Sequence, residues 1–215
     1  MIYDVSFLVK LKKLEKLNLS LCESVNSWSD FSKLTKLKQL DVSFSRISDM
    51  FFFSSFYKLK SLSIRSCKNI NRWPDWSKLF NLEYLNISYT YFSELSFLFS
   101  MSKLKWLNIS GCKRVKDWDN LSKLSNLVRL IITDNDITDL SCLSKLIKLE
   151  ELDISKCNKV NKLPDLRITC PNLEFLDISD AEFLAAGINQ TCAYGKDCIN
   201  RMFVSLDAAG KLYTE

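Results

Sequence analysis

The sequence contains no histidine. Histidine is the commonest general base and the commonest metal ligand, so its absence removes the usual catalytic triads and most metal-binding sets together. The chain also has neither a glycine-rich phosphate loop nor a Cys-x-x-Cys pair. These absences predict a protein that is not an enzyme and that carries no catalytic residue, metal or cofactor.

Glycine and proline are scarce as well, with 4 and 3 residues in a chain of 215. Their scarcity argues against a loop-rich or disordered protein and indicates turns made by Ser, Asn and Asp. Apolar runs such as Met50–Phe53 are far shorter than the roughly 18 residues of a membrane span, so no span is expected. The N-terminus lacks the charged leader, apolar block and cleavage site of a signal peptide.

One apolar pattern recurs along the chain. In Leu104–Val115, LKWLNISGCKRV, it has the spacing L-x-x-L-x-L-x-x-C. The same frame begins at Leu14, Leu37, Leu59, Leu82, Leu104, Leu127, Leu149 and Leu173, with steps of 23, 22, 23, 22, 23, 22 and 24 residues. This register predicts one continuous solenoid, in which each repeat is stabilised by its neighbours.

A second period of 45 residues lies over the first and indicates that a pair of repeats was duplicated. It relates Cys22, Cys67, Cys112 and Cys157, and likewise Ser45, Thr90 and Asn135, and Trp28, Trp73 and Trp118. Because the cysteine position also accepts Ser, Thr or Asn, we expect these four thiols to be free, buried and structural. The tryptophans are predicted to fill the core. Cys192 and Cys198 lie in the non-repeating tail, where a bridge and an unpaired role both stay open.

The repeat predicts an α/β solenoid of the horseshoe type. Each coil should begin with a short strand, for example 17–19 or 40–42, which builds a parallel concave sheet. Convex segments such as SDFSKLTKL have room only for a turn of α-helix or 3₁₀ helix, or for an extended segment. We expect residues 1–13 to be the back half of an incomplete repeat, 14–180 to form about eight coils, and 181–215 to be a cap and tail. The missing N-terminal cap favours a fragment of a longer array.

Outward-facing positions can be assigned to columns from the register. The first column varies most and carries the largest side chains: Lys16, Gln39, Ser61, Tyr84, Trp106, Arg129, Glu151 and Phe175. Tyr, Trp and Arg dominate binding hot spots, and a solvent-facing Trp on a sheet is hard to explain by folding. We therefore predict a partner-binding site at Tyr84, Tyr89, Trp106, Arg129, Ile131, Glu151, Asp153 and Phe175. The alternative is an aromatic ladder that only stabilises the sheet.

Two charged features have alternative interpretations. Acidic residues cluster on two successive coils: Glu150, Glu151 and Asp153 on one, and Glu174, Asp177 and Asp180 on the next. Such charges are usual on a solvated strand face, and we favour that interpretation over a metal site. Ten lysines precede their strands and should line one edge: Lys10, Lys13, Lys33, Lys36, Lys58, Lys78, Lys103, Lys123, Lys145 and Lys148. Such an edge fits nucleic acid or acidic lipid, yet a net charge of +5 favours a role in solubility.

From Leu14 to Ile178 the chain resembles the leucine-rich repeat superfamily. Its 22-residue repeats, such as LVRLIITDNDITDLSCLSKLIKL, are similar to those of bacterial internalins and of a nuclear regulatory subunit of protein phosphatase 1. Repeats with LDISKCNKV resemble the cysteine-containing type of ubiquitin-ligase adaptors and of multi-repeat proteins of trypanosomatid parasites. The resemblance implies binding of a protein partner on the concave sheet.

We therefore predict a non-catalytic interaction scaffold or adaptor. Two alternatives stay open, namely a structural subunit of a large protein or ribonucleoprotein assembly and an internalin-like surface adhesin. Cysteines in a ladder and the lack of a leader indicate the cytoplasm or another reducing intracellular compartment, with the cell surface as the alternative.

Overall fold

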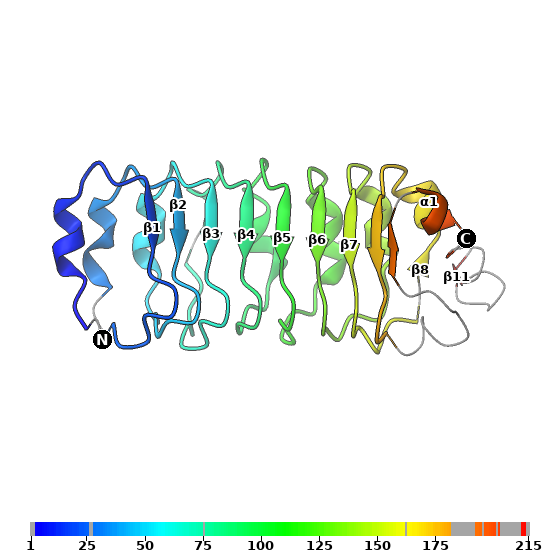
Figure 1. Ribbon diagram of the computed structural model, residues 1–215, viewed down its shortest axis with the longest axis horizontal. Helices are drawn as coiled ribbons and strands as arrows, with labels where there is room; N and C mark the ends of the chain where they lie inside the picture. Colours follow the sequence, from blue (N-terminus) through cyan, green and yellow to red (C-terminus); the bar gives the residue numbers. More distant parts are fainter. Residues whose placement is uncertain are drawn as a thin grey trace.

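The computed structural model describes residues 3–25, 28–74, 76–161, 163–181, 192–194, 196–200, 202 and 212–213. Short strands stand side by side along one face of the molecule (Figure 1). Eight of them are parallel: β1 (Lys16–Asn18), β2 (Gln39–Asp41), β3 (Ser61–Ser63), β4 (Tyr84–Asn86), β5 (Trp106–Asn108), β6 (Arg129–Ile131), β7 (Glu151–Asp153) and β9 (Phe175–Asp177). The open parallel sheet confirms the predicted solenoid.

The register of the sheet follows the repeat frame. Tyr84 pairs with Trp106 and Trp106 with Arg129, so each first-column residue lies beside its equivalent in the next coil. The strands begin and end one residue earlier than predicted, at 16–18 and 39–41 instead of 17–19 and 40–42. Six of the eight parallel strands end in an Asn or Asp whose side chain accepts the backbone N–H two residues on, as Asn18 does from Ser20 at 2.8 Å, and this bond turns the chain.

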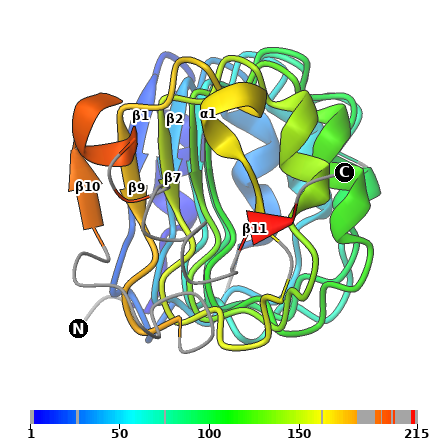
Figure 2. The ribbon, with the colours of Figure 1, turned by 90° about the vertical axis from the view of Figure 1, so that its right-hand side faces the viewer.

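The convex side consists mainly of single turns of 3₁₀ helix, which confirms the predicted short segments. Figure 2, viewed along the solenoid, shows them opposite the strands. They are η1 (Ser6–Lys10), η2 (Ser29–Lys33), η3 (Phe51–Ser55), η4 (Leu95–Leu98), η5 (Trp118–Lys123) and η6 (Ser141–Lys145), followed by one α-helical turn, α1 (Leu166–Thr169). A two-stranded sheet of β8 (Leu163–Pro164) and β11 (Leu212–Tyr213) completes this side.

The core fills the space between the two layers. Its largest fully buried side chains include Trp76, Phe31, Phe53, Phe56 and Phe92. The repeat tryptophans contribute as predicted, since Trp28 and Trp118 are buried and the half-buried Trp73 packs edge-on against Trp76 and Phe92. Each coil therefore completes the core of its neighbours, which is why the array is continuous.

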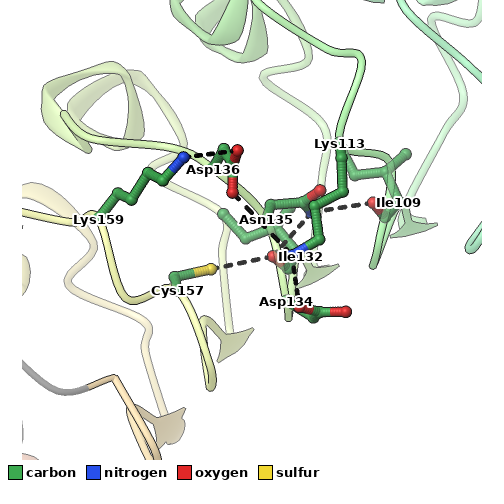
Figure 3. A network of polar contacts seen from close by, with 8 residues as sticks. All are labelled: Ile109, Lys113, Ile132, Asp134, Asn135, Asp136, Cys157 and Lys159. Atoms are coloured by element: carbon green, nitrogen blue, oxygen red, sulfur yellow. Dashed lines mark hydrogen bonds and ion pairs between the residues drawn. The ribbon is translucent and has the colours of Figure 1, made fainter.

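A ladder of small polar side chains runs through the turns that follow the strands. The thiols of Cys67, Cys112 and Cys157 donate to main-chain carbonyls of the preceding coil at 3.1, 3.3 and 3.1 Å. In the coil between two of them, the Asn135 amide donates to Ile109 and Ile132 at 3.0 and 2.9 Å (Figure 3). Burial raises the pKa of Cys112 and Cys157 to about 11, so both are neutral thiols at pH 7.

The structure bears out most of the prediction for the four ladder cysteines. All four are free, and three of them are fully buried. Cys22, in the first coil, is the exception because it is only half-buried.

The two ends of the solenoid differ. At the C-terminal end β10 (Cys192–Tyr194) pairs antiparallel with β9 and covers the sheet edge, and Ile199 and Met202 are buried in the core. Most other residues of the predicted cap at 181–215 lie outside the described residues, as does the side chain of Cys192. At the N-terminal end η1 packs beside η2. Among the described residues, no helix is long and apolar enough to cross a membrane.

Candidate functional site

Four of the predicted site residues form a continuous row across β4 to β7. The ring of Tyr84 stacks on that of Trp106, with centroids 4.0 Å apart and planes 12° apart. The Arg129 guanidinium lies 5.9 Å from the Trp106 ring centroid, and its Nε donates to Glu151 Oε2 at 2.9 Å. Phe175 occupies the same column in β9, beside Glu151. The register thus assembles the predicted first-column residues into one surface.

This row is partly open to solvent. Tyr84 and Trp106 are half-buried, and the side chains of Arg129 and Glu151 are 44% and 41% exposed. An ion pair with that exposure contributes at most about 1 kcal/mol to stability. The stacked rings contribute a similar amount beyond their burial, about 0.5–1.5 kcal/mol. The row therefore has a modest structural role and still presents an aromatic and arginine surface that a partner can reach.

The second column has a more structural role than predicted. Asp153 Oδ1 accepts hydrogen bonds from both the backbone N–H and the hydroxyl of Ser155, at 3.0 and 2.7 Å. Equivalent bonds to the backbone two residues on are made by Asn18, Asp41, Asn86, Asn108 and Asp177. The half-buried Ile131 stands between Asn108 and Asp153 in register. Asp153 thus shapes its turn through Oδ1.

Three of the six acidic residues weighed for a metal site are engaged within the protein. Asp153 and Asp177 accept turn N–H groups, and Glu151 pairs with Arg129. Within the part of the chain that the structure describes, no group of three or more potential metal ligands lies together.

Tyr89, the remaining predicted residue, lies on the turn that follows β4, and its φ is +58°. Together with two residues missed by sequence reasoning it forms a second cluster, in which the Arg65 guanidinium lies 5.4 Å from the centroids of both the Phe44 and Tyr89 rings. The signal in the sequence was Arg65 itself, because every other member of its column is serine or threonine: Ser20, Ser43, Ser88, Ser110, Thr133, Ser155 and Ser179.

The Tyr89 ring depends on a glycine in the next coil. Gly111 also has a positive φ of +63°, and a Cβ atom built there would lie 2.5 Å from Tyr89 Cδ1. Other coils place Phe44, Ser66 and Asp134 at this left-handed position, so the conformation itself is tolerated at a cost of about 1–2 kcal/mol. What Gly111 provides in addition is space for the ring.

We expect Gly111→Ala to destabilise the protein by about 1–3 kcal/mol, through the left-handed backbone and the displaced ring. Urea unfolding of Gly111→Ala, Tyr89→Ala and the double variant measures the coupling. The double variant should recover part of the loss, because the ring that clashes is gone. Strict additivity of the two single effects would show that Tyr89 does not depend on Gly111.

A hollow of about 440 Å³ adjoins the row at Tyr84. It lies on the concave face of β1 to β4, where Ser61 and Ser63 are short and Tyr84 forms the far wall. Its other lining residues are Lys16, Leu17, Asn18, Gln39, Leu40 and Asp41. The site predicted from the sequence began at Tyr84 and missed this depression, which results from small side chains beside a large one.

The lysine edge is partly tied to the protein itself. Of the ten edge lysines, Lys103 and Lys148 donate to the side-chain oxygens of Asn81 and Asn126 in the preceding coil, at 2.7 and 2.6 Å. Lys38 and Lys60, each two residues after an edge lysine, pair with Glu15 at 2.7 Å and with Glu83 at 3.0 Å. These contacts link successive coils and favour a structural role over nucleic-acid binding at this edge.

Comparison with known proteins agrees with the repeat. The family model described as "Leucine Rich repeats (2 copies)" matches residues 125–168. No curated protein matches the sequence. Internalin C2 of Listeria monocytogenes is similar in structure, with 24% identity and a TM-score of 0.71 over 80% of this chain and 74% of that one.

Two further solved structures are similar over part of their length. InlJ of Listeria monocytogenes, whose functional domain includes a cysteine ladder, has 22% identity and a TM-score of 0.64 over 82% of this chain and 36% of its own. The TLR13–ssRNA13 complex has 28% identity and a TM-score of 0.65 over 80% of this chain and 26% of that one. Likeness at this level of identity establishes the fold.

Proposed function

Because the chain is a leucine-rich repeat protein, we propose that it is a non-catalytic scaffold that binds a protein partner on its concave sheet. Leucine-rich repeats are typically protein-interaction modules. The observation that carries the proposal is the half-exposed Tyr84–Trp106 stack, which borders the hollow on β1 to β4. Large aromatic side chains beside a depression are typical of interface hot spots.

Arg129 extends the proposed site beyond the rings. Its guanidinium is held by Trp106 on one side and Glu151 on the other, which reduces the entropy it would lose on binding. Phe175 continues the surface in β9. A partner lying across the strands from the hollow towards β7 would therefore meet preordered aromatic and arginine groups.

The free cysteines support a setting in the cytoplasm or another reducing compartment. Six cysteines of the repeat region form no disulfide: Cys22, Cys67, Cys112, Cys142, Cys157 and Cys170. Five of them are buried, and they are retained as neutral thiols that fill core or ladder positions.

We expect Tyr84→Ala with Trp106→Ala to weaken partner binding by more than about 2 kcal/mol, the range of hot-spot residues. Proteins captured from source-cell lysate by the wild type would be quantified at low and high salt, and the dissociation constant of the main captured protein measured for each variant. The free energy of unfolding of this double variant should fall by only about 1 kcal/mol, through loss of the ring stack.

A matched control is Tyr57→Ala with Phe80→Ala. These aromatic residues are 43% and 44% exposed in successive coils, but they lie in the turns before the strands, away from the concave face. The control should bind like the wild type. If both double variants retain the same proteins and salt releases them, the concave site is not the binding surface.

A further inference from the structure

Arg65 lies in the turn after β3, two residues beyond Ser63, which lines the hollow. Ser61, Ser63 and Arg65 alternate along the chain and therefore face the same side, while Leu62 and Ile64 are buried between them. Ser61 and Ser63 line the hollow. Arg65 is exposed and adds a long cationic side chain to a column that is otherwise serine or threonine. The repeat itself does not require arginine at this position.

Two aromatic rings hold this guanidinium in place. Phe44 and Tyr89 come from the coils on either side, and each ring centroid is 5.4 Å from Arg65 Cζ. The rings are themselves constrained, because both residues have a positive φ and Tyr89 lies against Gly111. A guanidinium stacked between rings loses less freedom when it binds an anion than an unsupported one does.

The hydrogen-bonding groups of Arg65 are unused within the described residues. Arg129 and Arg167 are paired with Glu151 and Asp165, whereas Arg65 forms neither an ion pair nor a side-chain hydrogen bond there. A guanidinium carries five N–H donors in a planar fork that matches a carboxylate bidentately. Arg65 thus combines a fixed position with an open binding capacity.

We propose that Arg65 binds the carboxylate of an aspartate or glutamate in a partner peptide segment that occupies the hollow beside Tyr84. The proposal rests on the proposed function and names the chemistry of its partner. Asp41 and Lys16 contribute one negative and one positive charge to the lining of the same hollow, so the lining has no net positive charge to hold a nucleic-acid strand. A strand that carries one charge per nucleotide needs several cations, whereas one acidic side chain needs only Arg65.

The test uses random peptides displayed on phage and selected on the immobilised protein. Peptides whose binding is lost in the Tyr84→Ala/Trp106→Ala variant are expected to share an acidic residue at one position. A synthetic peptide of that sequence should bind at least about tenfold more weakly to Arg65→Ser, since a charge-assisted bidentate contact is lost. Replacing the peptide's acidic residue with its amide should weaken binding to the wild type and leave binding to Arg65→Ser unchanged.

Two variants control for folding and charge. Arg65→Ser installs the residue that most coils have in this column, so its unfolding midpoint should stay close to that of the wild type. If the midpoint falls, Arg65→Lys replaces it as the test variant, because lysine keeps the positive charge but lacks the planar guanidinium. Arg114→Ser removes another exposed arginine that lies over a ring, Tyr91 at 4.1 Å, but in the turn after β5, a strand that does not line the hollow. It should leave peptide affinity unchanged.

The outcomes separate this inference from the proposed function. Peptides that depend on Tyr84 and Trp106 but carry no acidic position, or that bind Arg65→Ser equally well, overturn the inference and leave the concave site in place. If no selected peptide depends on the two rings, both proposals fail. If the wild type binds oligothymidylate but no peptide, and Arg65→Ser loses that binding, then Arg65 recognises a phosphate and the proposed carboxylate ligand is wrong.

Discussion

Replacing Asn135 with aspartate is expected to destabilise the solenoid by about 3–5 kcal/mol, the range for an uncompensated buried charge. Asn135 is 2% exposed, and its amide nitrogen donates to the carbonyls of Ile109 and Ile132. Its Oδ1 has no partner in the described part of the chain. In the aspartate variant a carboxylate oxygen would replace the amide nitrogen and face the two carbonyl oxygens. Two hydrogen bonds would be replaced by electrostatic repulsion, although the side chain keeps the same size.

The effect should depend on pH in a defined direction. Burial and the two carbonyls raise the pKa of the new carboxyl in the folded state above about 3.9, its value in an unfolded chain. The folded variant therefore binds the proton more tightly, so the loss of stability is smallest below about pH 4 and grows as pH rises through the folded pKa. Urea unfolding of wild type and variant at about pH 4 and about pH 8 measures the difference.

Asn135→Ser provides the matched control. Serine and threonine occupy this ladder position in two other coils, as Ser45 and Thr90, so the smaller hydroxyl fits and the cost should be about 1–2 kcal/mol. Equal stability of the aspartate and serine variants would show that the amide is not a required donor.

Phe53→Ala is expected to cost about 3–5 kcal/mol through the cavity it leaves in the core. Phe53 is fully buried in η3, its ring centroid 4.8 Å from that of Phe52 and 5.7 Å from that of Phe56. Because each coil contacts only its neighbours, the loss should weaken the coupling of the coils on both sides. Thermal and urea unfolding would report a lower midpoint.

The adjacent Phe51 supplies the comparison. Its side chain is 60% exposed in the same helical turn, so Phe51→Ala should change the free energy of unfolding by less than about 0.5 kcal/mol. Similar losses for the two variants would mean that the turn is oriented differently from the structure described.

Several features could be predicted from the sequence because the repeat is strictly periodic. Equivalent residues pair in register when each coil lies on the previous one, so the order of Tyr84, Trp106 and Arg129 along the sheet followed from their spacing. The buried thiol at Cys112 followed in the same way, since its position accepts only small side chains. Periodicity determines which residues are neighbours, and in a solenoid neighbouring coils make most of the contacts.

Other features depended on side-chain direction, which spacing does not specify. Three consecutive phenylalanines are equivalent in composition, and only the orientation of η3 buries Phe53 and exposes Phe51. At six of the eight parallel strands the turn that follows is shaped by a side-chain oxygen such as that of Asn18, which bonds to the backbone two residues on.

The proposed site shows the same division. The sequence by itself determined the fold, the strand register and the row from Tyr84 to Glu151, because each of these follows from a frame of 22 to 24 residues. Only the tertiary structure decided that left-handed turns bring Phe44 and Tyr89 against Arg65, and that Ser61 and Ser63 leave a hollow beside Tyr84. The physical reason is that backbone dihedral angles and differences in side-chain volume decide where a side chain points and what space it leaves.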